Sequence, residues 1–359
     1  MRRTPALIVG GGPAGAATAI TLARAGASPV LVERSIGDRD VVCGGFLGWD
    51  ALAALKRLGL DVETLGASPI HRLRLVAGRR VVERALPQAA AGLSRRRLDS
   101  ALLRLAEGAG AVVHRGRAVR ALDGLRARLD DDEEMAADAI FLATGKHELR
   151  GAARDAGGRD LSVGLRTALA GTPRLARALA GTIELHLYDG GYAGLLVQED
   201  ESVNLCLSLS RRRMAEAGSH EAVIESLASE CPLLADRLEG GSPANWEAVA
   251  GVPYGWRARR GEKGLFRVGD QAAVIASLAG DGIAIALTSA GAAAQAFLAG
   301  GPDSAGPFQA EFARQARRPL AVAEALRGAA ERRLGRRLLV RLARLPGLAA
   351  AAARWTRIA

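Results

Sequence analysis

The arrangement of apolar and polar positions changes character near residue 160. Before that point, short apolar runs ending in glycines alternate with stretches of helical period, as in ALIVGGGPAGAATAITLARAG. This pattern predicts a buried strand, a tight turn and a helix, followed later by a helix at about 96–108 and a strand ending near 143. Between 160 and 250 the pattern favours short alternating strands. The chain therefore predicts an α/β fold with a doubly wound domain and an inserted antiparallel sheet.

Two predicted strands in the second region carry more detail. The segment GTIELHLYDGGYAGLLVQED predicts a β-hairpin with Asp189-Gly190-Gly191 as its turn. In SVNLCLSLS, leucines and a valine alternate with small polar residues. One face of this strand therefore packs in a core, because side chains alternate along a strand. The small polar face suits either solvent or a pocket, and the pattern leaves both open.

The first turn contains a specific glycine pattern. Gly10, Gly12 and Gly15 follow a predicted strand and open a predicted helix, with Pro13 and Ala14 between the last two glycines. In such a turn the first glycine permits a tight bend, the second admits a pyrophosphate, and the third lets helix and strand pack closely. Glu33 ends the next strand, 23 residues after Gly10, where a carboxylate can accept hydrogen bonds from ribose hydroxyls. The unit predicts binding of FAD or NAD and disfavours NADP.

Composition narrows the class of protein. The 359 residues are 49% hydrophobic and 24% charged, which fits a globular protein of two joined domains. Three cysteines without paired spacing argue against a disulfide framework or a zinc site, and the five histidines show no HxH or HExxH spacing. The apolar segment at 277–300 is long enough to span a bilayer, but Asp281 and its small residues favour a buried helix. We expect a soluble, cytoplasmic protein without a metal.

The net charge of +11 is concentrated at the C-terminal end. From Glu311 onward the chain has twelve arginines and three glutamates. Few aromatic residues are available to stack bases, so nucleic acid is not expected as a partner. The tail is either a solvated pair of arginine-rich helices or a surface for anionic lipid or an acidic carrier protein. In the second case the protein would be peripheral to a membrane. The sequence leaves the oligomeric state open.

Together these motifs resemble a known superfamily. The chain is similar to FAD-dependent oxidoreductases with the p-hydroxybenzoate hydroxylase fold, and within them to the geranylgeranyl reductase-like branch. The resemblance implies a Rossmann-like FAD domain of the glutathione reductase type. It also implies cofactor roles for Arg34, for Arg95 in SRRRLD, for Val119, and for Ala143, Thr144 and Gly145 in FLATG. The same holds for Gly269 and Asp270 in RVGDQAA, where the aspartate holds the ribityl hydroxyls, and for Gly280, Asp281, Gly282 and Ile283 in GDGIAIAL.

The segment VVCGGFLG falls where the reductase-like branch places a Cys-Gly pair against the flavin ring. The resemblance therefore implies that Cys43, Gly44 and Gly45 contact the flavin. A buried cysteine without a chemical role is the alternative, and a catalytic thiol is a third interpretation. Monooxygenase members commonly carry a proline shortly before the glycine loop, whereas this chain has Ser277 and no proline there. The distinctive Trp-x-Trp motif of the halogenase branch is also absent.

Four further residues are candidates for the substrate pocket. His186 shares a strand face with Glu184 and Tyr188, so it would bind or protonate substrate if that face met the flavin. Tyr192 follows the hairpin turn, and Tyr254 and Trp256 precede the predicted flavin strand at 265–269. Each is equally well explained by ordinary packing within the fold.

These observations give one architecture and three functions. We predict an FAD-binding domain at 1–68, 92–155 and 250–300, a substrate domain at 69–91 and 156–249, and a C-terminal helical segment at 301–359. The favoured function is an NAD(P)H-using monooxygenase acting on a small apolar substrate that is aromatic, polyketide or lipid-like, and either free, carrier-bound or lipid-associated. The first alternative is a flavin-dependent reductase of carbon–carbon double bonds in a prenyl or polyene chain. The second is a non-catalytic flavin-binding protein.

Overall fold

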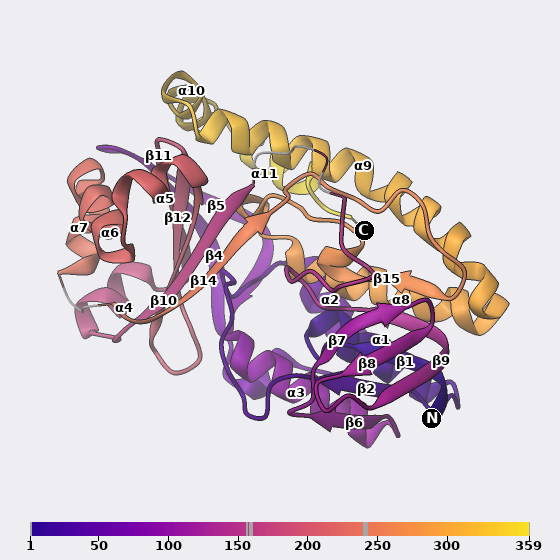
Figure 1. Ribbon diagram of the computed structural model, residues 1–359. Coiled ribbons are helices and arrows are strands. Elements are labelled where there is room, and N and C mark those ends of the chain that lie inside the picture. The colour runs from indigo at the N-terminus through magenta and orange to yellow at the C-terminus, as the bar shows by residue number, and fades with distance from the viewer. Residues whose placement is uncertain (1, 156, 158–160, 240–242, 359) are drawn as a thin grey trace.

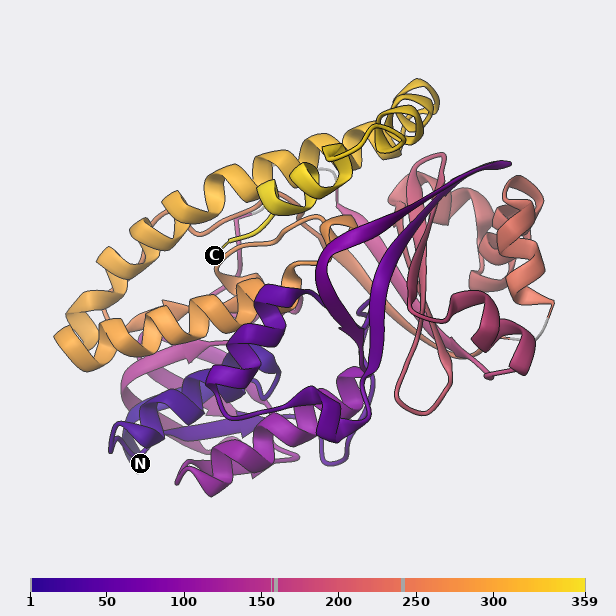
Figure 2. The same cartoon turned by 180° about the vertical axis from the view of Figure 1, so that it is seen from behind.

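The computed structural model describes residues 2–155, 157, 161–239 and 243–358. Two β-sheets lie beside each other, each with helices on its outer side, and a long C-terminal helix runs along both (Figure 1). The N-terminus lies in the first sheet, at the end of the molecule away from the second (Figures 1 and 2). This arrangement confirms the predicted α/β fold with a doubly wound part and a second, mainly antiparallel sheet.

Within the described residues, the first sheet has the order β6-β2-β1-β9-β8-β7, and β15 pairs with β9. The pairs β6–β2, β2–β1, β1–β9 and β9–β15 are parallel. Its strands are β1 (Arg2–Val9), β2 (Val30–Glu33), β6 (Val112–Arg115), β7 (Val119–Asp123), β8 (Arg126–Leu129), β9 (Glu134–Leu142) and β15 (Leu265–Arg267). The segment predicted at 265–269 therefore joins the sheet more than 120 residues after its neighbour β9.

Helices α1 (Pro13–Arg24), α3 (Arg95–Gly108) and α8 (Gly282–Gly300) pack beside this sheet, and α2 (Trp49–Arg57) contacts α8. Ile8, Phe141 and Phe266 are fully buried in the core that joins them. By length and composition, the stretch Gly282–Ala330 would also suffice to cross a membrane. Half of its most apolar part is buried against the rest of the protein, as expected for the core helix predicted there.

The second sheet has the order β14-β10-β13-β12-β11-β4-β5-β3 in the part of the chain that is described. All of its pairs are antiparallel except β11 with β4. The strands are β3 (Phe46–Leu47), β4 (Ser68–Ala77), β5 (Arg80–Gly92), β10 (Ser162–Leu169), β11 (Thr182–Tyr188), β12 (Gly191–Val197), β13 (Val203–Ser210) and β14 (Ala244–Val252). The predicted hairpin is β11–β12, with Asp189 and Gly190 between the strands.

Short helices cover the outer face of this sheet, and the chain ends in three further helices. The outer helices are α4 (Pro173–Leu179), α5 (Arg211–Ala217), α6 (His220–Glu230) and α7 (Pro232–Leu238). The C-terminal ones are α9 (Ala305–Ala330), α10 (Arg333–Ala343) and α11 (Leu348–Trp355). Among the described residues, four 3-10 turns connect other elements: η1 (Val62–Leu65), η2 (Gly269–Gln271), η3 (Ser277–Ala279) and η4 (Gly301–Ser304). Helix α10 lies against β4 and β5, and α11 against α9 and β5, so the tail reaches the second sheet.

Candidate functional site

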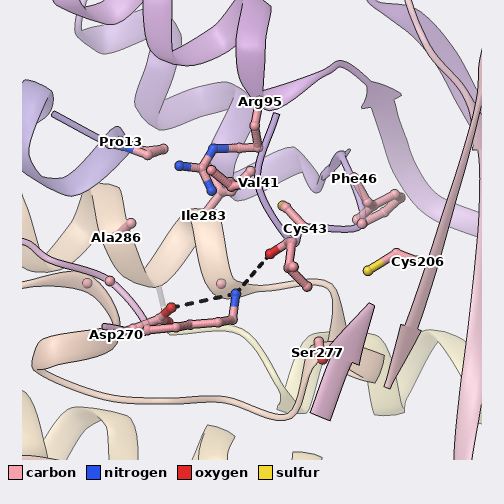
Figure 3. Close-up of a pocket in the computed structure, with 18 of the residues that line it drawn as sticks. Pro13, Val41, Cys43, Phe46, Arg95, Cys206, Asp270, Ser277, Ile283 and Ala286 are labelled. Atoms are coloured by element: carbon pink, nitrogen blue, oxygen red, sulfur yellow. Dashed lines mark hydrogen bonds and ion pairs between the residues drawn. The ribbon is translucent and has the colours of Figure 1, made fainter. Parts of the chain in front are cut away.

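A cavity of about 890 Å³ is lined by residues of both sheets and of the C-terminal helices. Figure 3 shows Pro13, Arg95 and Asp270 toward one side of it, Phe46, Cys206 and Ser277 toward the other, and Cys43 between these groups. The first group comes from the first sheet and its helices. The second group comes mainly from strands and turns at the second sheet.

The glycine turn forms one end of the cavity. Gly10 has a φ of +106°, and a Cβ there would lie 2.5 Å from the carbonyl oxygen of Ala143. The Glu33 carboxylate accepts hydrogen bonds from the backbone N–H of Gly11 at 2.6 Å and of Ser35 at 2.8 Å. These bonds fix the carboxylate at the end of β2, beside the glycine turn, where the sequence analysis expected it to meet a ribose.

Two helices begin at the cavity without a side-chain cap. Gly12 precedes α1 and Asp281 precedes α8, and neither gives a capping hydrogen bond. The first turns of both helices line the cavity through Pro13 and Ala14, and through Gly282 and Ile283. Free N–H groups and the positive end of each helix dipole therefore face the space, which suits phosphate or an electron-rich ring edge. This arrangement fits the pyrophosphate and flavin of FAD.

Arg95 lies at the start of α3, and Ser94 caps that helix by accepting a hydrogen bond from the N–H of Arg97 at 3.1 Å. The guanidinium of Arg95 donates hydrogen bonds to both carboxylate oxygens of Asp99, at 2.8 and 2.7 Å. Burial alone would lower the pKa of Arg95, but the attraction and hydrogen bonds of Asp99 outweigh burial and raise it. A permanently charged guanidinium thus faces the cavity, close to Gly12. This position suits the phosphate role that the resemblance implied.

Asp270 lines the cavity in η2, immediately after β15. Its carboxylate lies 3.8 Å from the ammonium of Lys146, which also donates a hydrogen bond of 3.2 Å to the carbonyl of Val42 (dashed lines in Figure 3). Burial alone would lower the pKa of Lys146, but the charge of Asp270 raises it. Lys146 was not among the site residues predicted from the sequence. Its position directly after Ala143-Thr144-Gly145 was the available signal.

The Cys-Gly-Gly segment runs along the cavity between its two ends. Cys43 and Gly44 line it, and Gly45 has a φ of +69°, which favours glycine. The amide of Asn204 donates to the carbonyl of Cys43 at 3.1 Å, and the N–H of Gly45 donates to the Cys43 sulfur at 3.5 Å. The segment is therefore held from β13 of the second sheet, with its thiol beside the space.

The small polar face of β13 also meets the cavity. Cys206 lines it, and Ser208 lies 3.4 Å from the hydroxyl of Tyr254, which in turn lies 2.5 Å from the hydroxyl of Ser277. The opposite face packs in a core with Leu205 and Leu209. Of the two interpretations left open by the sequence, the pocket-lining one is therefore correct.

Tyr192 and Tyr254 present buried phenols at the same wall. Burial raises the pKa of both phenols above the ordinary value, for Tyr192 by a large amount. Both groups therefore stay protonated at neutral pH and are available as hydrogen-bond donors. The Tyr192 position agrees with its prediction as a pocket residue.

Two predicted catalytic residues lie elsewhere. Leu185 and Leu187 of β11 line the cavity, so His186, which alternates with them, points to the outer face. There its Nε2 lies 2.8 Å from Glu184, whose carboxylate is also paired with Arg74 and Arg237. Trp256 packs in the main core, and its indole donates to the carbonyl of Asp155 at 2.8 Å, outside the cavity lining. Both expectations are corrected.

Most of the predicted cofactor residues line the cavity. These are Gly10, Gly12, Pro13, Ala14, Glu33, Arg34, Cys43, Gly44, Arg95, Val119, Ala143, Thr144, Gly145, Gly269, Asp270, Gly280, Gly282 and Ile283. Three of the predicted residues, Gly15, Gly45 and Asp281, do not line the cavity but lie next to residues that do. A Cβ on Gly15 would meet the Gly10 carbonyl, and the buried Asp281 is paired with Arg357 of the C-terminal segment. Their contribution is therefore to shape the site.

Comparison with known proteins agrees with this geometry. Residues 3–151 match the family model described as FAD binding domain. No curated protein matches the chain in sequence. The fold is similar to that of the flavin-dependent brominase Bmp2, with a TM-score of 0.78 at 14% identity over 99% of this chain and 93% of that one.

Two other solved structures are similar. A geranylgeranyl bacteriochlorophyll reductase-like protein from Thermoplasma acidophilum gives a TM-score of 0.77 at 18% identity, over 99% of this chain and 95% of that one. PqsL of Pseudomonas aeruginosa, a probable FAD-dependent monooxygenase, gives 0.70 at 18% identity over 94% and 99%. Residues 3–151 thus match an FAD-binding domain. The complete chain has the fold of these three solved proteins, which agrees with the fold that the motifs predicted.

Proposed function

We propose that this FAD-dependent oxidoreductase is a monooxygenase acting on an apolar aromatic, polyketide or lipid-like substrate. When bound, FAD would accept a hydride from NAD(P)H and activate O₂. In the net reaction, one oxygen atom enters the substrate as a hydroxyl and the other leaves as water. NAD(P)H provides the two electrons and becomes NAD(P)⁺, and one proton is consumed.

The observation that carries this proposal is the unequal distribution of charge around the cavity. Charged groups such as Glu33, Arg95, Lys146 and Asp270 gather where the first sheet lines it. The wall formed by β4, β5 and β11 is apolar, through Leu73, Leu75, Leu86, Ile183, Leu185 and Leu187. A wall of this kind binds a substrate through its apolar surface and keeps water from the reacting atoms. A charged or strongly polar substrate would lose its hydration there without compensation.

Two uncharged polar groups, the phenols of Tyr192 and Tyr254, also line the cavity near this wall. The protonated phenols of Tyr192 and Tyr254 can each donate a hydrogen bond to an oxygen of the substrate. The hydroxyl of Ser277 holds Tyr254 from the other side, which fixes the direction in which the phenol points. Such a donor orients an otherwise apolar molecule so that one of its carbons faces the flavin.

Reduction of a carbon–carbon double bond is the second candidate, and Cys43 is the observation that favours it. In that reaction a hydride adds to one carbon of the substrate and a proton to the other, with the electrons again taken from NAD(P)H. The Cys43 thiol borders the cavity and could donate this proton, after which water would reprotonate the thiolate. Ser277, in place of the proline common in oxygenases, also suits this chemistry.

Single-turnover experiments distinguish the two reactions. The enzyme is reduced with NAD(P)H in the absence of oxygen and mixed with 4-nonylphenol or geranylgeraniol, and ¹⁸O₂ is then admitted. We expect no product before oxygen is added and one ¹⁸O atom per product molecule afterwards. A product that has gained two hydrogens without oxygen would rule out monooxygenation and support the reductase.

A matched pair of variants tests the role of the pocket phenol. Tyr254→Phe should weaken binding of a phenolic substrate by about 2- to 12-fold, because loss of one hydrogen bond costs about 0.5–1.5 kcal/mol. Tyr188→Phe is the comparison variant, since the Tyr188 ring packs in the core of the outer face and its hydroxyl donates to the backbone carbonyls of Tyr192 and Ser208, not into the cavity. Equal effects of the two changes on the KM for 4-nonylphenol would contradict the assignment of Tyr254.

A further inference from the structure

Helix α10 has apolar side chains on two nearly opposite sides. Val340 and the partly buried Leu339 face the protein, where α10 packs against β4, β5 and β11. A second row of leucines on the helix and the turn after it is open to solvent. The exposed fractions are 76% for Leu334, 55% for Leu338, 38% for Leu342 and 50% for Leu345. At 3.6 residues per turn these four share one stripe, roughly opposite the buried one.

A row of arginines runs beside the exposed leucines. Three of them, Arg333, Arg337 and Arg341, are exposed, and each comes directly before one of the exposed leucines in the sequence. The residues that the structure describes provide no acidic partner for these three, in contrast to Arg336, which is paired with Asp189. From Arg332 to the last residue the chain has eight arginines and no acidic residue. The outward side of α10 is therefore both apolar and strongly cationic.

The exposed row continues into the wall of the cavity. Leu342 belongs to both, and Leu348 of α11 is exposed and also lines the cavity. Ala349, Ala352 and Ala353 extend this apolar lining along α11. Trp355, at the end of α11, is 53% exposed. Apolar side chains of α10 and α11 are thus shared between the exposed surface and the lining of the cavity that holds the flavin site.

We propose that the α10 surface, formed by Leu334, Leu338, Leu342 and Leu345 with Arg333, Arg337, Arg341 and Arg344, docks on an anionic lipid bilayer. Arginines would lie at the phosphate headgroups and the leucines at the acyl boundary, the arrangement of an interfacial amphipathic helix. Figures 1 and 2 show α10 at an outer end of the molecule, where a flat surface can approach it. An acidic carrier protein would satisfy the arginines, but it gives no reason for a continuous row of exposed leucines.

This docking would also supply the substrate of the proposed function, because an apolar molecule dissolved in the bilayer would meet the protein at α10 and α11, beside the cavity. That part of the inference rests on the proposed function. The docking itself does not, since it is measured without turnover.

The test uses the FAD-loaded protein and co-sedimentation with vesicles. One set contains phosphatidylcholine only, and the other contains one quarter phosphatidylglycerol. We expect at least tenfold stronger partitioning to the anionic vesicles. Leu334→Ser with Leu338→Ser should reduce that partitioning at least tenfold, since both side chains lose their apolar burial. Arg337→Gln with Arg341→Gln should reduce it about tenfold or more, in proportion to the loss of charge near the surface. Leu298→Ser is the control, because Leu298 is exposed at the end of α8 and should not matter.

Three results would overturn the proposal. One is equal, weak partitioning to both vesicle types. Another is binding to anionic vesicles that depends on the arginines but survives the double leucine change, because the leucines would then not enter the acyl boundary. The third is a self-association in solution, detected by analytical ultracentrifugation, that the leucine change abolishes, because a second copy would then cover the surface. The ¹⁸O₂ experiment with detergent-dispersed substrate remains valid in each case, so the two proposals fail independently.

Discussion

The glycine turn should respond very differently to alanine at two of its positions. A Cβ on Gly15 would lie 1.8 Å from the carbonyl oxygen of Gly10, and real contacts of this kind are essentially never under 3.0 Å. Helix α1 would therefore have to move away from β1 by about 1.2 Å. A Cβ on Gly12 would meet only the guanidinium of Arg95 at 3.2 Å, the end of a side chain. Gly12 also has a φ of −71°, which any residue adopts.

We expect Gly15→Ala to lower the free energy of unfolding by about 1–3 kcal/mol, the usual cost of overpacking. For a chain of 359 residues that corresponds to a Tm lower by roughly 1 °C per kcal/mol, because the unfolding entropy is about 2.1 cal/mol/K per residue. Flavin content should also fall, because the displaced helix would carry the phosphate-binding N–H groups with it. Gly12→Ala should leave the Tm of the apoprotein unchanged and reduce flavin content, since the added methyl group occupies the pyrophosphate's space.

Gly291→Ala in α8 is the control, because no atom lies within 4 Å of its added Cβ. It should be neutral or stabilising by about 0.5–1 kcal/mol, the gain for replacing a helical glycine. The measurements are flavin absorbance per protein and thermal unfolding with and without FAD. Full flavin content and an unchanged Tm in Gly15→Ala would refute the packing argument. A fall in apoprotein Tm for Gly12→Ala as large as for Gly15→Ala would refute the distinction between them.

Three further changes test other parts of the structure. Asp270→Ala should raise the Kd for FAD, measured by fluorescence titration, by roughly tenfold to a hundredfold, because a hydrogen bond to a charged group contributes about 1.5–3 kcal/mol. An unchanged Kd would show that Asp270 does not bind FAD. Cys43→Ala should leave flavin content intact and alter flavin reduction only modestly in stopped flow. A tenfold slower reoxidation by substrate, about 1.4 kcal/mol in the barrier, would instead identify its thiol as a proton donor. Burial would raise the pKa of Glu184, but hydrogen bonds from His186, Arg237 and Arg74 lower it from 4.5 to about 2. The carboxylate therefore stabilises the fold above about pH 4.5, and this contribution of about 3 kcal/mol is lost as the pH falls toward 2. Glu184→Gln should destabilise the protein at pH 7 and flatten acid unfolding between pH 4.5 and 2, and an acid-unfolding curve like the wild type's would contradict this.

The cofactor end of the site could be predicted from the sequence because its chemistry depends on backbone geometry. A turn that brings two backbones within contact distance requires glycine at Gly10 and Gly15, and this requirement is visible in the sequence spacing. The strand ends that carry Glu33 and Asp270 are likewise fixed by short apolar runs. Lys146 was missed because a lysine after a strand is usually solvated, and only the tertiary structure shows it between Asp270 and the carbonyl of Val42.

The substrate end was less predictable because either face of a strand can be the inner one. Strand β11 has apolar residues at Ile183, Leu185 and Leu187 and polar ones at Glu184 and His186. A polar pocket would have used His186, whereas this protein buries His186 in an ion-pair cluster beneath the outer helices and lines the cavity with the leucines. The sheet itself was predicted correctly, but the direction of its faces depends on the helices α4 to α7, which cover one side.

Helix α10 presents the same difficulty, because the sequence does not show which side of the helix packs on the protein. Its leucine stripe, read from the sequence alone, could pack on the protein or stay open. Packing of that stripe on the protein would be the simpler outcome, because exposing apolar surface to water is unfavourable. The structure uses the other side, through Leu339 and Val340, to attach α10 to the second sheet, and it leaves Leu334 and Leu338 outside. A helix that is already held by one apolar face gains nothing in folding from a second one. The exposed row, flanked by unpaired arginines and continuous with the cavity, therefore needs an explanation outside the folded chain, and docking on a bilayer supplies one.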